Sequence, residues 1–169
     1  NNGLATANAL ALDATADGQL SNSSDRDYYA VTVEAAGTLT VRIDTAVSQT
    51  YGWVLSLFNA DNYLLSSVRC SGTGCRTDGE SFTAGIASAG TYYIQVRPYD
   101  TCCSGARSPT DNYQVSASYS STTGGVELEP NNGLATANAL ALDATADGQL
   151  SNSSDRDYYA VTVEAAGTL

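Results

Sequence analysis

DYYAVTVEAAGTLTVRI, residues 27–43, alternates apolar and polar side chains on both sides of a short break. The apolar positions are Tyr29, Val31 and Val33 before the break, and Leu39, Val41 and Ile43 after it. Alternation with a period of two is typical of a strand that buries one face. The break, Glu34–Gly37, is short and ends in glycine, which adopts turn conformations easily. The stretch therefore predicts two strands, Asp27–Val33 and Leu39–Ile43, joined by a tight turn.

Similar segments extend over the rest of the first 120 residues. The further predicted strands are Trp53–Phe58, Tyr63–Val68, Glu80–Ile86, Thr91–Val96 and Tyr113–Tyr119. We expect Glu80–Ile86 and Thr91–Val96 to pair around Ala89-Gly90. Residues 1–12 predict a short helix at most, or a packed extended arm. Seven or eight short strands between polar turns predict an all-β domain, an antiparallel β-sandwich of jelly-roll-like type.

An internal repeat sets the organisation of the chain. Asn1–Leu39 recurs letter for letter as Asn131–Leu169, an offset of 130 residues. A unit of this size suits one domain. Ser120–Gly125 (SSTTGG) has the composition of a flexible linker. We expect residues 1–125 to form one sandwich repeat that lacks its acidic linker. Residues 126–169 are then a linker and the start of the next identical repeat.

Composition and charge exclude several functions. The 169 residues carry 18 acidic and 7 basic side chains, a net charge of −11, and no histidine. This charge disfavours nucleic acid and suits divalent cations. Without histidine no Ser-His-Asp triad can form, and nothing else in the sequence indicates an enzyme. No apolar run approaches the roughly 20 residues that cross a bilayer, so we expect no membrane span.

Four cysteines, Cys70, Cys75, Cys102 and Cys103, fall within one unit. An even number of cysteines in an acidic chain of this composition predicts two disulfides formed outside the cytoplasm. In an antiparallel meander the two cysteine-bearing loops lie at the same end, which favours bridges from Cys70 and Cys75 to Cys102 and Cys103. A local Cys70–Cys75 bridge beside a vicinal Cys102–Cys103 bridge is the alternative, and so is a zinc site, although the spacing fits zinc motifs poorly.

Oxygen-bearing side chains gather around the repeat boundary. The linker and the start of the second copy supply Glu127, Glu129, Asn131 and Asn132, and Asp155 and Asp157 follow about two dozen residues later. Carboxylates at alternate positions can converge, and Ca²⁺ takes six to eight oxygen ligands. The sequence thus predicts a calcium site at the junction. A solvated acidic linker beside an Asp-rich turn is the alternative.

The combination E-x-E-P-N-N, Gly148-Gln149-Leu150 and D-x-D-Y-Y resembles the bacterial pre-peptidase C-terminal (PPC) domain family, which is similar to the collagen-binding domains of clostridial collagenases. The resemblance covers Glu127–Thr168 by motif and the rest of the unit by strand pattern. It implies a secreted β-sandwich module with Ca²⁺ between the acidic segment and the Asp-bearing loop, with Ser154 or a carbonyl as an alternative to the second Asp. The residues implied in the first copy are Asn1, Asn2, Asp25 and Asp27.

Two functions follow as hypotheses. The first is a structural subunit of an extracellular, secreted or cell-surface fibre or stalk. In this fibre, disulfide-stapled repeats are neighbours in a covalent array or self-assemble, and Ca²⁺ stiffens each junction. The alternative is a repeated adhesin or substrate-binding module, appended to a secreted enzyme, that grips polysaccharide or an extracellular protein with the avidity of repetition.

Overall fold

The fold is described from a computed structural model, which defines residues 1–45, 52–70, 79–99, 112–121 and 125–167. The elements are the 3₁₀ turn η1 (Leu4–Thr6) and the strands β1 (Asn8–Ala9), β2 (Thr15–Gln19), β3 (Asp27–Val33), β4 (Gly37–Thr45), β5 (Trp53–Phe58), β6 (Leu64–Cys70), β7 (Glu80–Ile86), β8 (Gly90–Pro98), β9 (Asn112–Ser120) and β10 (Leu128–Glu129), followed by η3 (Leu134–Thr136), β11 (Asn138–Ala139) and β12 (Tyr159–Ala160). The described helical segments are single turns, and none of them could cross a membrane.

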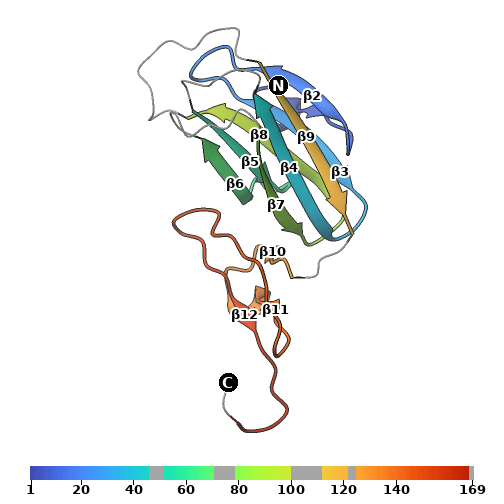
Figure 1. The fold of residues 1–169 in the computed structure, drawn as a ribbon, viewed down its shortest axis with the longest axis vertical. Helices are drawn as coiled ribbons and strands as arrows, with labels where there is room; N and C mark the ends of the chain where they lie inside the picture. The colour runs from blue at the N-terminus through green and yellow to red at the C-terminus, as the bar shows by residue number, and fades with distance from the viewer. Residues whose placement is uncertain (46–51, 71–78, 100–111, 122–124, 168–169) are drawn as a thin grey trace.

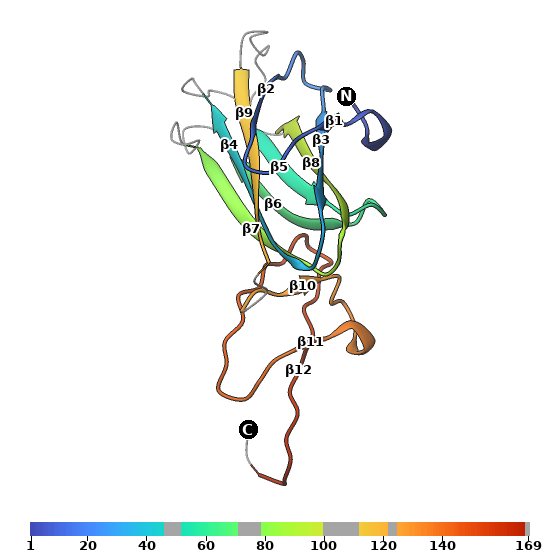
Figure 2. The same cartoon turned by 90° about the vertical axis from the view of Figure 1, so that its right-hand side faces the viewer.

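Two five-stranded sheets form a β-sandwich, which confirms the predicted all-β class (Figure 1). One sheet has the order β1-β3-β8-β5-β6 and the other β10-β7-β4-β9-β2. The alternating positions Val31, Leu39 and Val41 are fully buried in the core between them. Figure 2 shows the two sheets edge on, with residues 126–167 extending below them.

The predicted pairing of Glu80–Ile86 with Thr91–Val96 is wrong, and the consecutive strands β3 and β4 do not pair with each other either. β3 pairs with β8, whereas β4 pairs with β7 and β9, so the turn after Val33 crosses from one sheet to the other. Likewise β7 pairs with β4, and β8 with β3 and β5. The two sheets of a sandwich lie about 10 Å apart and share one core. Alternation identifies the buried face of a strand, but it does not say which sheet the strand joins.

The disulfide prediction lies outside the described residues. Cys75, Cys102 and Cys103 are not described, and of Cys70 only the backbone, the last residue of β6, is described. The two bridges therefore stay predictions.

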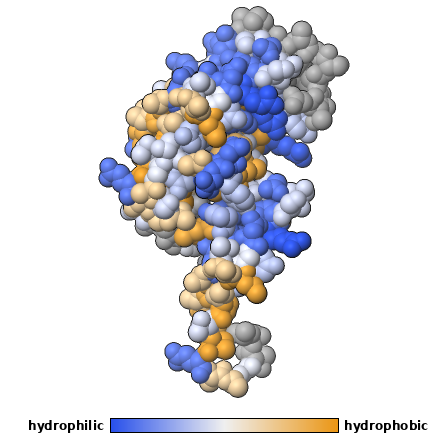
Figure 3. All heavy atoms as spheres, turned by 180° about the vertical axis from the view of Figure 1, so that it is seen from behind, coloured by the Kyte–Doolittle hydropathy of each residue, from blue (hydrophilic) through white to orange (hydrophobic). Residues whose placement is uncertain are grey.

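Residues 131–167 reproduce the turns and the short parallel pairing of residues 1–37, but they have no counterpart of β2 and only two strand residues where β3 has seven. β11 pairs with β12 in parallel with Asn138 opposite Tyr159, as β1 pairs with β3 with Asn8 opposite Tyr29. The surroundings differ, because large apolar side chains of the second copy are exposed. These exposed residues are Leu134, Leu142, Leu150, Val161 and Val163. Figure 3 shows apolar surface on the narrow lower part of the molecule.

Candidate metal centre at the junction

The linker joins the sandwich as an added edge strand. β10 pairs in parallel with β7, with Leu128 opposite Gly85. A side chain at Gly85 would overlap the carbonyl oxygen of Glu127, so glycine is required for this close approach. The backbone N–H of Glu127 also donates to the carbonyl of Asp147, at 3.0 Å, in the second copy. The linker is thus fixed between the first sandwich and the segment that follows.

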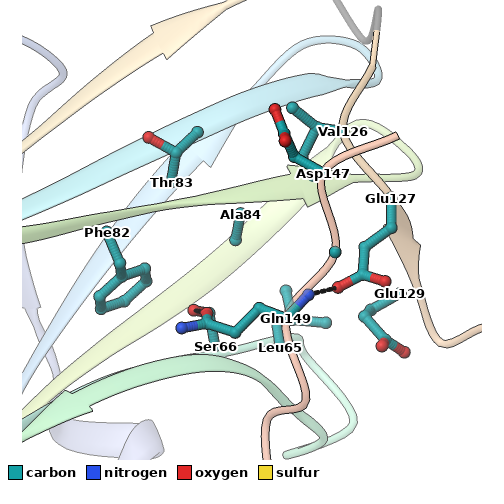
Figure 4. Close-up of a pocket in the computed structure, with 12 residues that line it drawn as sticks. Leu65, Ser66, Phe82, Thr83, Ala84, Val126, Glu127, Glu129, Asp147 and Gln149 are labelled. Atoms are coloured by element: carbon teal, nitrogen blue, oxygen red, sulfur yellow. Dashed lines mark hydrogen bonds between the residues drawn. The ribbon is translucent and has the colours of Figure 1, made fainter. Parts of the chain in front are cut away.

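This placement brings three carboxylates together. Glu127 and Glu129 come from the linker and Asp157 from the second copy, and one oxygen of each lies within 4.8 Å of the others. Both glutamates are only 6 % exposed. Figure 4 shows these two side chains beside each other at the edge of the sandwich, where Asp147 and Gln149 approach. Of the predicted site residues, these three form a cluster of ligand-bearing oxygens.

Glu127 is held by donors from the second copy. The Tyr159 hydroxyl donates to Oε2 at 3.0 Å, and the backbone N–H of Gln149 donates to Oε1. Gly148 makes room for this arrangement, since a Cβ there would meet both the Tyr159 hydroxyl and Glu127 Oε2. Donors that satisfy a buried carboxylate also orient it. Glu127 therefore has a defined position rather than that of a solvated linker residue.

Asn131 is fully buried against the same carboxylates. Its backbone N–H donates to Glu129 Oε2 at 3.0 Å. Its side-chain nitrogen reaches Glu127 Oε2 at 3.3 Å in one amide orientation and Glu129 Oε1 at 3.3 Å in the other. Neighbouring Asn132 spans the joint: its Oδ1 accepts from the Arg156 N–H at 2.8 Å, and its Nδ2 donates to the Tyr63 hydroxyl of the first sandwich.

Asp155 has a separate task in its loop. Its Oδ2 accepts from the Ser151 N–H at 2.6 Å and its Oδ1 from the Arg156 N–H at 3.0 Å. In the first copy, Asp25 accepts from Ser21 and Arg26 in the same way, at 2.7 and 2.9 Å. Burial acts to raise the pKa of Asp25, but these hydrogen bonds outweigh it and hold the pKa below its usual value. Asp155 therefore shapes the loop that presents Asp157.

The cluster carries an excess of negative charge. Burial, together with the charges of Asp155, Glu127 and Asp157, raises the pKa of Glu129 to about 7. Burial and the neighbouring Glu127 raise the pKa of Asp157 to about 6. Near neutral pH the crowded carboxylates therefore favour either a shared proton or a bound cation. Since the clustered ligand atoms are carboxylate oxygens, a hard divalent cation such as Ca²⁺ fits them.

The first copy arranges the same residues differently. Asp27 is buried and accepts a 2.5 Å hydrogen bond from the Tyr113 hydroxyl, which lies 3.0 Å from the Tyr29 hydroxyl. Burial raises the pKa of Asp27 and that of Tyr113. In the first copy, the core residue Tyr113 therefore lies beside Asp27, whereas in the second copy Glu127 lies beside Asp157. The described residues contain no carboxylate cluster of ligand geometry around Asp27.

Asn1 and Asn2 of the first copy lie near the aspartates with which they were predicted to form a site. With its amide nitrogen directed inward, Asn2 donates to Asp25 Oδ1 at 3.2 Å and to the Arg26 carbonyl at 3.0 Å. The carbonyl of Asn1 accepts from the Tyr28 N–H at 3.0 Å, just as Asn131 accepts from Tyr158 at 3.2 Å. Asn1, Asn2, Asp25 and Asp27 thus lie near one another.

Sequence reasoning did not predict the parts played by Tyr159, Gln149 and Tyr63. One signal was available, because Tyr159 follows Asp157 by two residues and side chains two apart share a strand face. The Gln149 and Tyr63 contacts depend on where the second copy meets the first sandwich. That placement is a tertiary feature, and the spacing of the motifs does not contain it.

Comparison with known proteins identifies the domain. Residues 25–98 match the family described as bacterial pre-peptidase C-terminal domain, and this match includes Asp25, Asp27 and strands β3 to β8. The match confirms, over residues 25–98, the resemblance to the PPC family that the combination of E-x-E-P-N-N, Gly148-Gln149-Leu150 and D-x-D-Y-Y predicted. The acidic E-x-E-P-N-N segment lies outside the matched residues. No curated protein matches the chain.

Several solved structures are similar to this chain. The PPC domain of the collagenase from Bacillus anthracis is 21 % identical with a TM-score of 0.49, covering 69 % of this chain and 99 % of that domain. CorA, a surface-associated copper-binding protein of Methylomicrobium album, is 10 % identical with a TM-score of 0.49, covering 68 % and 98 %. PliG of Aeromonas hydrophila, a periplasmic lysozyme inhibitor, is 14 % identical with a TM-score of 0.44, covering 67 % and 96 %. The family assignment rests on the sequence match.

Proposed function

We propose that this chain is part of an extracellular fibre or stalk built from tandem, jelly-roll-like PPC units, in which Ca²⁺ stiffens each junction. Residues 1–125 are one unit, and residues 126–169 are the linker and the beginning of the next. The proposal is supported most directly by one observation. Linker carboxylates Glu127 and Glu129, both buried, converge with Asp157 of the following copy.

The residues present fit a calcium ion. Glu127, Glu129 and Asp157 would bind it directly, and the predicted ligands Asn131 and Asn132 would contribute amide oxygens after a rotation of their side chains. Asp155 keeps free lone pairs beyond its two backbone hydrogen bonds, because a carboxylate offers about four acceptor positions. The cation would neutralise the charge that raises the pKa values of Glu129 and Asp157, and would link linker and unit.

A cation at this position would limit motion between units. The linker is fixed to the preceding sandwich through the β10–β7 pairing, and the carboxylates reach the following copy. Anything that binds the ordered junction better than the loose one stabilises the ordered junction by mass action. Repeated along an array, this mechanism converts flexible Ser/Thr/Gly links into defined joints.

Location outside the cell fits this function. Secretion is expected of a PPC module, and an oxidising environment suits the two predicted disulfides among Cys70, Cys75, Cys102 and Cys103. Each bridge would stabilise a unit by roughly 2–4 kcal/mol. Calcium is also plentiful outside cells, where sites of modest affinity remain occupied.

Calorimetric titration of the 169-residue chain with CaCl₂ tests the site. We expect one ion bound per junction, and at least about a tenfold loss of affinity in the Glu129→Gln/Asp157→Asn double variant, since two of three clustered carboxylates lose their charge. The matched control is Glu164→Gln, which removes an exposed carboxylate of the second copy and should leave affinity unchanged. Unchanged affinity in the double variant would refute the proposed ligands.

A further inference from the structure

A groove runs over the outer face of the sheet that contains β6, β5 and β8. Its volume is about 600 Å³, and the strands contribute Ser56, Arg69, Gln95 and Arg97 to its lining. Leu150, Ser151 and Asn152 of the second copy close one side of it. The groove is separate from the carboxylate cluster, which lies around β10 and β7.

Three kinds of side chain follow one another along this groove, and the register of β5, β6 and β8 sets their order. Phe58 lies opposite Tyr93, Ser56 opposite Gln95, and Val54 opposite Arg97 across β5 and β8. On the other side of β5, Ser56 lies opposite Ser67, and Val54 opposite Arg69. The face thus passes from aromatic through hydroxyl and amide groups to guanidinium groups. At about 3.3 Å per residue, Phe58 and Val54 are about 13 Å apart along the strand.

Polar side chains in the middle of the face are unusually buried. Ile94 and Val96 fill the core, so Gln95 points to the outer face, yet it is only 6 % exposed. Ser56, between core residues Leu55 and Leu57, is 4 % exposed. Gln95 donates to the Tyr28 hydroxyl, which orients its amide. A concave surface with a few oriented polar groups among apolar ones is the usual form of a ligand site.

Among the described lining residues, the charge is opposite in sign to the net charge of the chain. The chain has 18 acidic side chains and a net charge of −11, yet the described lining residues include two arginines and no acid. The Arg69 guanidinium lies over the Tyr99 ring, 5.6 Å from its centre, and Arg97 donates to the Pro98 carbonyl at 3.1 Å. Guanidinium groups with fixed positions recognise carboxylates well.

We propose that this groove binds an acidic polysaccharide, with its sugar carboxylates on Arg69 and Arg97. Sugar hydroxyls would exchange hydrogen bonds with Ser56, Ser67 and Gln95, since hydroxyl and amide groups both donate and accept. An apolar sugar face would rest on the aromatic end at Phe58. A glycan fits better than an acidic peptide, because Phe58 provides an apolar surface for a sugar face beside hydroxyl and amide side chains that can bind sugar hydroxyls.

Titration of the 169-residue chain with short oligosaccharides tests the groove. The probe is tetragalacturonate, and cellotetraose is the neutral control. Calcium-free buffer containing a chelator prevents calcium from bridging the glycan, so the result does not depend on the junction site. We expect saturable binding of tetragalacturonate that weakens as salt increases, and much weaker binding of cellotetraose.

Variants locate the site. Arg69→Gln/Arg97→Gln should weaken tetragalacturonate binding at least about tenfold, whereas Arg42→Gln on the opposite sheet should not change it. Ser67→Glu, which adds a negative charge inside the groove, should weaken binding as well. Circular dichroism of each variant checks that it is folded. On the unmodified chain, the side-chain amide resonance of Gln95 should shift during the titration.

Several results would overturn the proposal. They are an absence of saturable tetragalacturonate binding, equal affinity in the double arginine variant when it is folded, and a Gln95 resonance that does not shift. Equal binding of cellotetraose would show that the carboxylates are not recognised. Equally tight binding of a short polyglutamate would mean that the groove selects acidic peptides instead.

Discussion

Two copies of one 39-residue sequence lie in this chain, and they share turns and a short parallel strand pairing but have different partners. Asp27 and Tyr29 meet the core residue Tyr113, whereas Asp157 and Tyr159 meet the linker residue Glu127. Even the equivalent glycines differ: a Cβ at Gly18 would meet Tyr113, and a Cβ at Gly148 would meet Tyr159 and Glu127. The turns and the short parallel pairing are therefore encoded locally. Burial and electrostatics are determined by what the segment packs against.

The largest difference between the two copies is expected when the same leucine is shortened to alanine in each of them. Leu20 is 6 % exposed and Leu150 is 65 % exposed. Leu20→Ala should lower the free energy of unfolding by about 2–4 kcal/mol, because it leaves a cavity in the core. Leu150→Ala should change it by less than about 0.5 kcal/mol. Urea unfolding of the 169-residue chain measures both.

Equal effects of the two leucine variants would contradict the difference in burial. They would mean that Leu150 is covered in solution by another sandwich, for example through exchange of segments between molecules. Sedimentation of the unmodified chain at several concentrations distinguishes such exchange from packing within one molecule.

The pH dependence of calcium binding tests whether the carboxylates at the junction are crowded together as the structure shows. The raised pKa values, about 7 for Glu129 and about 6 for Asp157, mean that calcium must displace protons below neutral pH. We expect calcium affinity to increase by about tenfold or more from pH 5.5 to pH 7.5. Calorimetry in buffers of different ionisation enthalpy should detect the protons released. A flat affinity profile over this range would contradict the carboxylate cluster.

Calcium affinity should increase with pH, but without calcium Glu129 and Asp157 should make the ordered junction less stable as pH increases. A carboxyl whose folded pKa is raised binds more protons in the ordered state, so the junction loses stability as pH increases through the window from about 4.5 to about 7. Hydrogen exchange at the Gln149 and Asn131 amides, measured in chelator, should therefore show less protection at pH 7.5 than at pH 5.5, after correction for the intrinsic exchange rate.

A smaller difference is expected from removing one hydroxyl in each copy. Tyr29→Phe removes a buried hydrogen bond with Tyr113 and should cost about 1 kcal/mol of unfolding free energy. Tyr159→Phe removes a half-buried donor to Glu127, and its effect should be less than about 0.5 kcal/mol. If Tyr159→Phe were the more damaging variant, the second copy would be part of a cooperative core.

Much of the fold could be predicted from period-two alternation. Asp27–Val33, Trp53–Phe58 and Glu80–Ile86 have the predicted bounds, and the other predicted strands shift by one to two residues at their ends. β2 was not predicted, since its sequence, TADGQ, has almost no apolar pattern and joins the sheet through its pairing with β9. The partners of β3 and β7 could not be predicted either, because both sheets bury their strands in one core.

The candidate site was partly visible in the sequence. The alternate pairs Glu127/Glu129 and Asp155/Asp157 predicted that carboxylates converge, and the structure clusters Glu127, Glu129 and Asp157. The separate role of Asp155 as a loop acceptor was not visible, because the two aspartates differ only in the direction of their side chains. On an extended chain, the side chains of Asp155 and Asp157 would point to the same side. The turn before β12 breaks this alternation.

The central claim is that calcium orders the junction, and small-angle X-ray scattering of a four-repeat array tests it most directly. With calcium, the array should be longer and its distance distribution that of a stiff rod, and chelator should shorten and broaden it. An array carrying Glu129→Gln/Asp157→Asn at every junction should resemble the chelated state in both conditions. Identical scattering of the unmodified array with calcium and with chelator would contradict the claim.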